Sequence, residues 1–180
     1  MLKNLCSLLS AIFISLASSG QQFLPDDYCL VWSDEFNING APNTSNWRYE
    51  EGCSIRNGEA QFYTNNRREN ARVENGNLII EARRETMGTC GYTSASLITA
   101  GKVVHTYGRF EMRAKINISK GAWPAFWTLG QNGEWPSNGE IDIMEFYNNR
   151  IHANVAWGTE TRWSAKWDSQ NKLVSELGNN

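Results

Sequence analysis

The sequence predicts an all-β sandwich or barrel, and three observations support this fold class. Gly and Asn recur about every ten residues through the body of the chain, which is typical of short strands joined by tight turns. The stretch 109–118 alternates between polar and apolar side chains, the pattern of a strand with one buried and one solvated face. No stretch of comparable length has the helical period.

Composition supports one ordinary folded domain. The chain has 180 residues, of which 41% are hydrophobic and 20% charged, and this balance argues against disorder. The 17 Lys and Arg against 19 Asp and Glu argue against nucleic acid as a partner, because nucleic-acid binders usually carry a basic surplus. Eight Trp exceed what a small core needs. We therefore expect several of them to be exposed in a groove.

The first residues predict a secretory signal peptide, 1–20. Lys3 is followed by the apolar run 5–16 and by the small residues 17–20. A buried or membrane-spanning helix is the alternative, but spanning takes roughly 20 apolar residues. We expect an exported protein, secreted or periplasmic, without membrane association after cleavage, whose domain is 21–180.

Three cysteines remain after that cleavage. Cys29, Cys53 and Cys90 do not have the C-x-x-C spacing of a zinc or redox site. In an oxidising compartment two of them can pair, and Cys53 with Cys90 is the pairing we favour. Unpaired, inert cysteines are an equally open interpretation.

Two strand elements precede the acidic region. Asn75-Gly76 separates Arg72-Val73 from the apolar run 78–80, which predicts a hairpin with a tight turn. The second element is the strand expected over 109–118, whose apolar face is Phe110, Met112, Ala114, Ile116 and Ile118.

A carboxylate cluster follows at 139–146. On a regular strand Glu140 and Asp142 share one face, while Ile141 and Ile143 point into the core. Glu145 is then out of phase, and burying an unpaired carboxylate is costly. One extra residue, a β-bulge near Met144, would bring all three acids to one face.

Two such carboxyls suit glycoside hydrolysis. A separation of about 5–5.5 Å fits a retaining mechanism, with a nucleophile and an acid/base. Acids packed together cannot all ionise cheaply, so at least one pKa should rise. The alternatives are an acidic, solvated strand face and a calcium site with oxygen ligands.

Tryptophans surround this cluster. Trp123 and Trp127 precede it and share a face of an extended strand, and Trp135 leads directly into it. Indole faces suit the apolar faces of sugar rings. Trp157, Trp163 and Trp167 follow the cluster. The alternative is that about half of these rings belong to the core, and Pro124 indicates an edge strand or a bulge.

Together these residues resemble glycoside hydrolase family 16, which includes laminarinases, lichenases and agarases. The resemblance covers most of residues 30–160, in the stretches 31–36, 56–64, 70–82, 107–115, 123–127 and 139–146. It implies a β-jelly-roll of two curved antiparallel sheets (concanavalin A-like). It also implies Glu140 as nucleophile, Glu145 as general acid/base, and Asp142 as the acid that positions and tunes them. The two residues between Asp142 and Glu145 resemble the bulged motif of laminarinases and agarases.

The same resemblance implies a glycan cleft. Asn57, Glu59 and Tyr63 match a segment that lines the cleft in relatives, as Trp123 and Trp127 do. Loop scaffold and core are the alternative roles.

Two departures from the family pattern matter. Relatives often have two His four residues apart after the motif; here His152 is present, as a contact of the site or an ordinary His, and Ala156 stands at the second place. Family domains also usually continue further, so we expect 21–180 to be a partial catalytic domain, incomplete at its C-terminal end. The late ligand of the calcium site found in relatives is not identifiable. We therefore assign no cofactor and no metal ligand, and a structural calcium ion stays open.

The function predicted is a secreted, endo-acting, retaining β-glucanase acting on β-1,3- or mixed β-1,3/1,4-glucan, a polysaccharide partner, and we expect a monomer. The alternatives are an agarase- or carrageenase-type galactan hydrolase, a transglycosylase, and a non-catalytic glycan-binding protein. Sulfated galactans need basic groups, and the Trp-rich segments carry few besides Arg162 and Lys166. This favours a neutral glucan.

Overall fold

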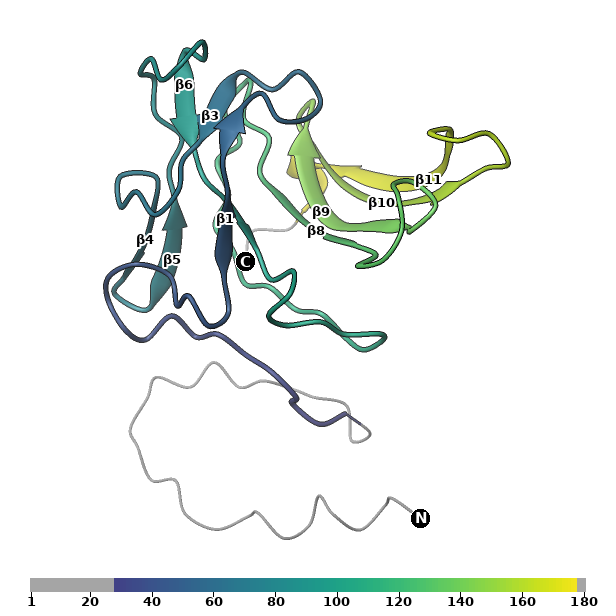
Figure 1. Ribbon diagram of the computed structural model, residues 1–180, viewed down its shortest axis with the longest axis horizontal. Coiled ribbons are helices and arrows are strands. Elements are labelled where there is room, and N and C mark those ends of the chain that lie inside the picture. The colour runs from purple at the N-terminus through teal and green to yellow at the C-terminus, as the bar shows by residue number, and fades with distance from the viewer. Residues whose placement is uncertain (1–27, 178–180) are drawn as a thin grey trace, which may run out of the picture. The chain divides into compact units, whose positions relative to one another are not determined.

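The computed structural model describes residues 28–177, and in this part of the chain the fold is almost entirely β (Figure 1). The one helical element there is a single 3-10 turn, η2 (Val174–Glu176). This confirms the all-β class. The predicted signal peptide, 1–20, lies outside the described residues.

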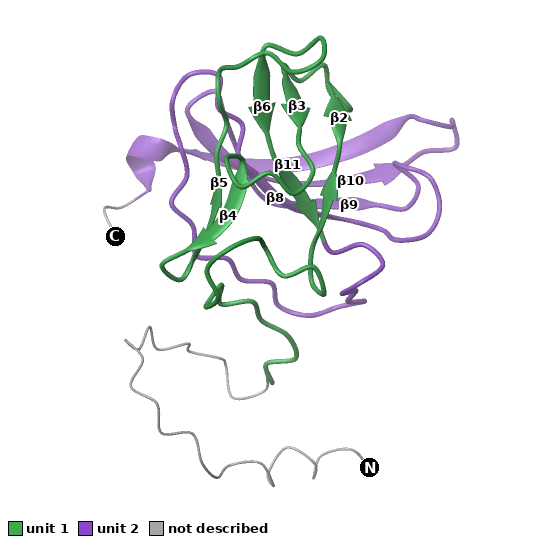
Figure 2. Cartoon of the chain, turned by 60° about the vertical axis from the view of Figure 1, so that its left-hand side comes forward, with its two compact units in different colours: residues 1–98 green, residues 99–180 purple. Residues whose placement is uncertain are grey.

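The chain divides into two compact units, with the boundary in the sequence between Ile98 and Thr99, and Figure 2 colours them separately. In the first unit β1 pairs with β7, β3 lies between β2 and β6, and β4 pairs with β5. Its strands are β1 (Arg48–Glu50), β2 (Gly52–Cys53), β3 (Gln61–Tyr63), β4 (Ala71–Glu74), β5 (Asn77–Ile80), β6 (Tyr92–Ser94) and β7 (Ser96–Ile98).

The predicted hairpin forms between β4 and β5. Glu74 pairs with Asn77 at its end, and Asn75 and Gly76 make the turn with φ of 51° and 74°. Two positive φ angles are what a type I′ turn requires, and its twist matches that of the flanking strands. The Asn-Gly signal is therefore confirmed.

A polar network lies at the centre of the first unit. Asn70 and Thr93 are both 0% exposed, and the Asn70 amide donates to Thr93 Oγ1 at 2.9 Å. Thr64 donates to Asn70 Oδ1 at 3.0 Å, and Arg67 forms a bidentate ion pair with Glu85. Buried polar groups are tolerated when they are bonded in this way.

A disulfide joins Cys53 to Cys90, with 5.8 Å between their Cα atoms. This confirms the favoured pairing. Cys29 is exposed and lies outside this bond.

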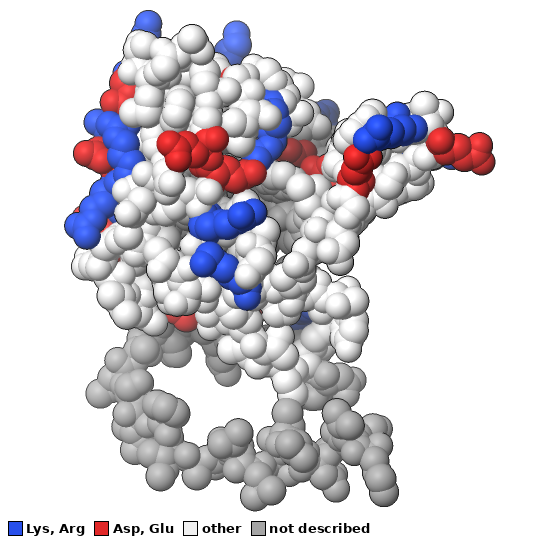
Figure 3. All heavy atoms as spheres, in the orientation of Figure 1, with Lys and Arg blue, Asp and Glu red and all other residues white. Residues whose placement is uncertain are grey.

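Charges of both signs lie side by side on the face shown in Figure 3. Among the ion pairs of the described residues, Arg72 contacts both Glu74 and Glu81. The pairing of opposite charges keeps local net charge low, in line with the near-neutral composition.

The second unit contains a four-stranded antiparallel sheet in the order β11-β10-β9-β8, the green-to-yellow part of Figure 1. Its strands are β8 (Ala125–Leu129), β9 (Glu140–Tyr147), β10 (Arg150–Gly158) and β11 (Ala165–Leu173). β8 starts directly after Pro124 and is an edge of this sheet, which agrees with the edge position expected for that proline.

The predicted β-bulge is present in β9. His152 pairs with Glu145 and Asn154 with Asp142, so the two residues between these acids stand opposite the single residue Ala153. The register with β8 shifts at the same place. The extra residue returns Glu145 to the face of the other two acids.

The strand predicted over 109–118 is wrong. This stretch has no strand pairing, and Phe110, Met112 and Ile118 are 42%, 44% and 52% exposed. Alternation indicates which side chains could share a face, but a strand also needs a hydrogen-bonded neighbour, and none pairs with this stretch among the described residues.

Two further expectations need correction. The described strands group into four sheets rather than two, and β3 and β6 run parallel. Ile141 is 53% exposed rather than buried. It lies between Thr128 and Val155 on the face opposite the acids, where the described residues provide no complete cover.

Candidate active site

The three acids of β9 lie on one face of the four-stranded sheet. In the register with β10, Glu140 pairs with Ala156, Asp142 with Asn154 and Glu145 with His152. Directly paired residues project from the same face of a sheet, so these partners share the acid side, which we call the acid face. The bulge therefore brings Glu145 to the same face as Glu140 and Asp142, as predicted.

Asn154 bridges two of the acids. Its amide nitrogen donates to Asp142 Oδ2 at 3.0 Å and to Glu145 Oε2 at 2.8 Å. Asn154 is 6% exposed and Asp142 3% exposed. An amide group has two N–H donors, so one side chain can bond both carboxylates and fix their spacing. Asn154 Oδ1 is also buried, and no described residue bonds to it.

Glu145 is placed where it retains a proton easily. Burial raises the pKa of the Glu145 carboxyl, and the negative charges of Asp142 and Glu140 raise it further. The Trp123 indole N–H, which donates to Glu145 Oε1 at 3.0 Å, lowers this pKa. The net direction is upward, which fulfils the expectation that crowding would raise the pKa of at least one acid.

Glu140 has a different partner. Trp135 Nε1 donates to Glu140 Oε2 at 2.5 Å. Glu140 and Glu145, which flank Asp142 in β9, thus each accept a hydrogen bond from an indole N–H.

The loop 130–139 places Trp135 through two close backbone approaches. A Cβ at Gly130 would lie 1.9 Å from the Asn138 carbonyl oxygen, and the Asn138 amide donates to the Gly130 carbonyl at 2.7 Å. A Cβ at Gly158 would lie 2.6 Å from Ser137 Oγ. These contacts close the loop and hold it against the end of β10, which brings Trp135 to Glu140.

Trp127 also belongs to the acid face. It pairs with Asp142 across β8 and β9, while Trp123 lies just before β8 and bonds Glu145. The two tryptophans thus share one face, as the sequence predicts, while a role in binding glycan stays a prediction for both and for Trp135.

His152 and Tyr147 form a stacked pair beside Glu145. Their ring centroids are 3.8 Å apart with an interplanar angle of 3°, and Trp123 packs edge-on against Tyr147 at 5.8 Å. His152 is 7% exposed. The structure therefore places His152 inside the site, opposite Glu145. Burial and the charges of Glu145 and Asp142 raise the pKa of the Tyr147 phenol.

Sequence reasoning missed Asn154 and Tyr147. A signal existed for both. Tyr147 is two residues after Glu145, and Asn154 is two residues after His152, so period-two alternation places each on the acid face.

The other predicted binding residues belong to the first unit. Glu59 Oε2 accepts hydrogen bonds from Tyr63 OH at 2.8 Å and from Gln61 at 2.9 Å. Burial and the Glu59 carboxylate raise the pKa of Tyr63 to about 12. Asn57 is exposed in a turn with φ of 53°. Glu59 and Tyr63 thus form a local pair, and a role in binding glycan stays a prediction for all three predicted residues.

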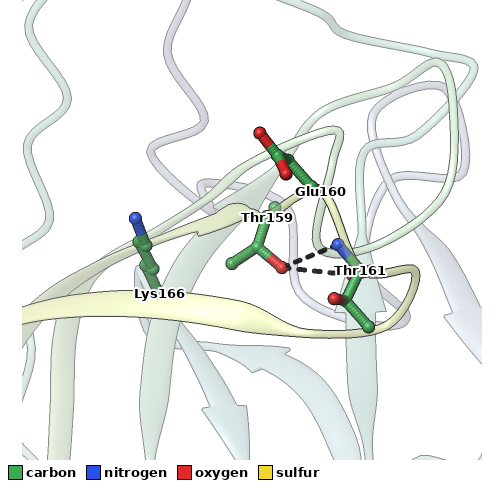
Figure 4. Close-up of a pocket in the computed structure, with 5 residues that line it drawn as sticks. Thr159, Glu160, Thr161 and Lys166 are labelled. Atoms are coloured by element: carbon green, nitrogen blue, oxygen red, sulfur yellow. Dashed lines mark hydrogen bonds between the residues drawn. The ribbon is translucent and has the colours of Figure 1, made fainter.

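A surface hollow lies at the β10–β11 hairpin (Figure 4). None of the three acids of β9 lines it. Thr159 and Thr161 shape its turn through two hydrogen bonds, and Lys166 lies at its edge. Lys166 pairs with Trp157, which places both on the face opposite the acids.

Neither a metal centre nor a membrane helix is found within residues 28–177. No group of His, Cys, Asp and Glu there has an arrangement that could hold a metal ion, so the structure adds no ligand set for calcium. None of its helices has the length and apolarity needed to cross a bilayer.

Comparison with known proteins decides the family. Residues 47–179 match the family described as the XgeA-like catalytic GH16 domain. The chain belongs to family GH16. It is 44% identical over 165 residues to a β-glucanase of Rhodothermus marinus, covering 86% of this chain and 58% of that protein. It is also 44% identical to a glucan endo-1,3-β-glucosidase of Cryptopygus antarcticus, covering 68% of this chain and 47% of that one. The GH16 chain described here therefore spans about half the length of these relatives.

Solved structures of GH16 laminarinases agree with the fold. The structure is similar to that of the Rhodothermus marinus laminarinase with a TM-score of 0.72, covering 81% of this chain and 62% of that one at 44% identity. The endo-1,3-β-glucanase catalytic domain of Thermotoga petrophila gives a TM-score of 0.70 at 39% identity, covering 82% and 64%. The family resemblance and the jelly-roll class drawn from the sequence are thereby confirmed.

Proposed function

We propose that this GH16 chain carries the catalytic strand of a secreted, endo-acting, retaining β-glucanase that cleaves β-1,3- or mixed β-1,3/1,4-glucan. The observation that carries the proposal is the single face of β9 on which Glu140, Asp142 and Glu145 meet. One of these carboxyls, Glu145, has a raised pKa, and another, Glu140, accepts a hydrogen bond from the Trp135 indole.

The surroundings of Glu145 and Glu140 support a separate role for each in the two steps of the reaction. Glu145, protonated, gives its proton to the glycosidic oxygen as the bond to the anomeric carbon breaks. The Glu140 carboxylate attacks that carbon and forms a glycosyl ester. Glu145, now a carboxylate, takes a proton from water, and the hydroxide oxygen replaces Glu140 at the anomeric carbon. The sugar leaves with its original configuration, and both carboxyls return to their starting states.

Asp142 has a supporting part in this scheme. It lies between the two glutamates and raises the pKa of Glu145 by its charge. When Glu145 loses its proton in the first step, the Asn154 amide remains bonded to both carboxylates and offsets part of their repulsion.

The glucan specificity rests on relatives. The Rhodothermus marinus protein is a β-glucanase, and a Rhizobium meliloti relative, 37% identical over 136 residues, is an endo-1,3-1,4-β-glycanase. Export is supported by the Cys53–Cys90 disulfide, because such bonds persist in oxidising compartments. Other relatives are a keratan-sulfate endo-1,4-β-galactosidase and a β-1,3-glucan-binding protein, so galactan hydrolysis and binding without catalysis are the competing functions.

A substrate panel tests the proposal. Purified protein is incubated with laminarin, barley β-glucan, lichenan and agarose, and new reducing ends are measured. We expect release from the glucans and none from agarose. Activity confined to agarose would instead support a galactanase. Binding to laminarin without release from any substrate would support the glycan-binding alternative.

A further inference from the structure

Trp167 lies on the acid face two strands away from Glu140. Glu140 pairs with Ala156 in β10, and Ala156 pairs with Trp167 in β11. Neighbouring strands are about 4.8 Å apart, so the row from Glu140 to Trp167 spans roughly 10 Å across the sheet. Trp167 is 50% exposed, so half of its surface is open to a ligand.

The space between Glu140 and Trp167 is aromatic. Trp135 donates to Glu140 and lies with its ring centroid 6.3 Å from that of Trp167, at an angle of 50°. The two rings are tilted rather than stacked, and Trp167 keeps half of its surface exposed beside Trp135. Ala156 stands where relatives often have a His. Its side chain is only a buried methyl group, so the two indoles fill the space in this row.

We propose that Trp167 forms a remote subsite for a neutral β-linked glucan chain, separate from the subsites at the scissile bond. The inference rests on the proposed function. The exposed indole stacks on the apolar face of a pyranose ring that lies beyond the sugar held at Glu140. Only an oligosaccharide long enough to reach across β10 gains this contact, so the subsite makes affinity depend on chain length.

Two other exposed tryptophans of this unit do not fit the same role. Trp157 neighbours Ala156 in β10 and is 44% exposed, but it projects from the opposite face of the sheet. Trp163 lies in the hairpin with the Arg162 guanidinium 4.9 Å from its ring centroid, and Arg162 is also paired with Glu134. Trp157 is therefore a matched control for Trp167, with the same residue type, similar exposure and the other face.

The test measures binding in the Glu140→Gln background, which removes turnover. Affinities for laminaribiose and laminarihexaose are determined by calorimetry for this protein and for versions that also carry Trp167→Ala, Trp167→Phe or Trp157→Ala. We expect Trp167→Ala to weaken laminarihexaose binding by roughly fivefold to tenfold and to leave laminaribiose unchanged. Trp167→Phe should keep most of the affinity, and Trp157→Ala should change neither ligand.

The outcomes separate this subsite from the proposed function. Unchanged laminarihexaose affinity in Trp167→Ala, or an equal loss for both ligands, would overturn the subsite while the enzyme still cleaves laminarin. Absence of both glucan binding and cleavage in the unsubstituted protein would overturn the subsite and the proposed function together. Retained laminaribiose binding by Trp167→Ala also shows that this variant is folded.

Discussion

The two faces of the four-stranded sheet differ in which of their central side chains are enclosed. On the acid face Asp142, His152 and Asn154 are 3%, 7% and 6% exposed, whereas on the other face Ile141 and Val155 are 53% and 39% exposed. A sheet ordinarily buries its apolar side and solvates its polar side. Here the polar side chains are the enclosed ones.

The enclosure of these polar side chains shows how the acid face is organised. Burying a polar group is unfavourable unless it is hydrogen-bonded, and burying charge is more so. Asn154 meets that requirement for Asp142 and Glu145, and Trp123 and Trp135 meet it for the two glutamates. The face therefore holds its carboxyls in fixed positions for chemistry, at some expense in stability.

The largest effect on the acid face is expected from Glu145→Gln. The amide is not acidic and cannot transfer a proton to the leaving oxygen, so we predict that kcat on laminarin falls by roughly 10²–10⁴. Reducing-end assays against the parent measure it, with circular dichroism to verify folding. A variant with near-parent kcat would remove Glu145 from the mechanism.

The next effect is expected from Asn154→Ala. Losing two hydrogen bonds to charged groups should lower kcat roughly tenfold to a hundredfold. The amide donors favour the carboxylate forms, so their removal raises the pKa of Glu145, and the alkaline limb of the pH–rate profile should move to higher pH.

Val155→Ala is the matched control for Asn154→Ala, because Val155 is adjacent in β10 and on the other face. A loss of kcat in Asn154→Ala without any movement of the alkaline limb would indicate a purely structural role for Asn154.

A smaller effect is expected from Trp123→Phe. The ring remains, but the indole N–H that lowers the pKa of Glu145 is lost. The pKa of Glu145 should rise, so the alkaline limb moves up while kcat near its optimum changes only severalfold. If the limb moves down instead, the hydrogen bond does not act on Glu145 as described.

The least effect is expected from Val155→Thr on the opposite face. This side chain is partly exposed and projects from the face opposite the carboxyl groups. We therefore predict unchanged kcat and KM, measured on laminarin. A substantial loss of activity would show that the two faces are not independent.

The sequence was most informative where local rules decide the structure. The Asn75-Gly76 turn follows from the backbone angles those residues tolerate, and the bulge in β9 is predicted from the cost of burying an unpaired Glu145 carboxylate. Both the class of fold and the shared face of the acids could therefore be predicted.

Features that depend on neighbours could not be predicted in this way. β9 and the stretch 109–118 both alternate, yet β9 pairs with strands on both sides and 109–118 pairs with none among the described residues. The bonds from Trp135 to Glu140 and from Asn154 to two acids arise from loop closure and strand register, which the alternation of one strand does not contain.

Covalent trapping tests the central claim most directly. The protein is incubated with an activated 2-deoxy-2-fluoro laminaribioside, which slows hydrolysis of a glycosyl ester, and the labelled peptide is identified by mass spectrometry. We predict a single ester on Glu140, and none in Glu140→Gln. An ester on another residue, or turnover of laminarin with inverted anomeric configuration and no ester, would contradict the assignment of Glu140 and Glu145 as a retaining pair.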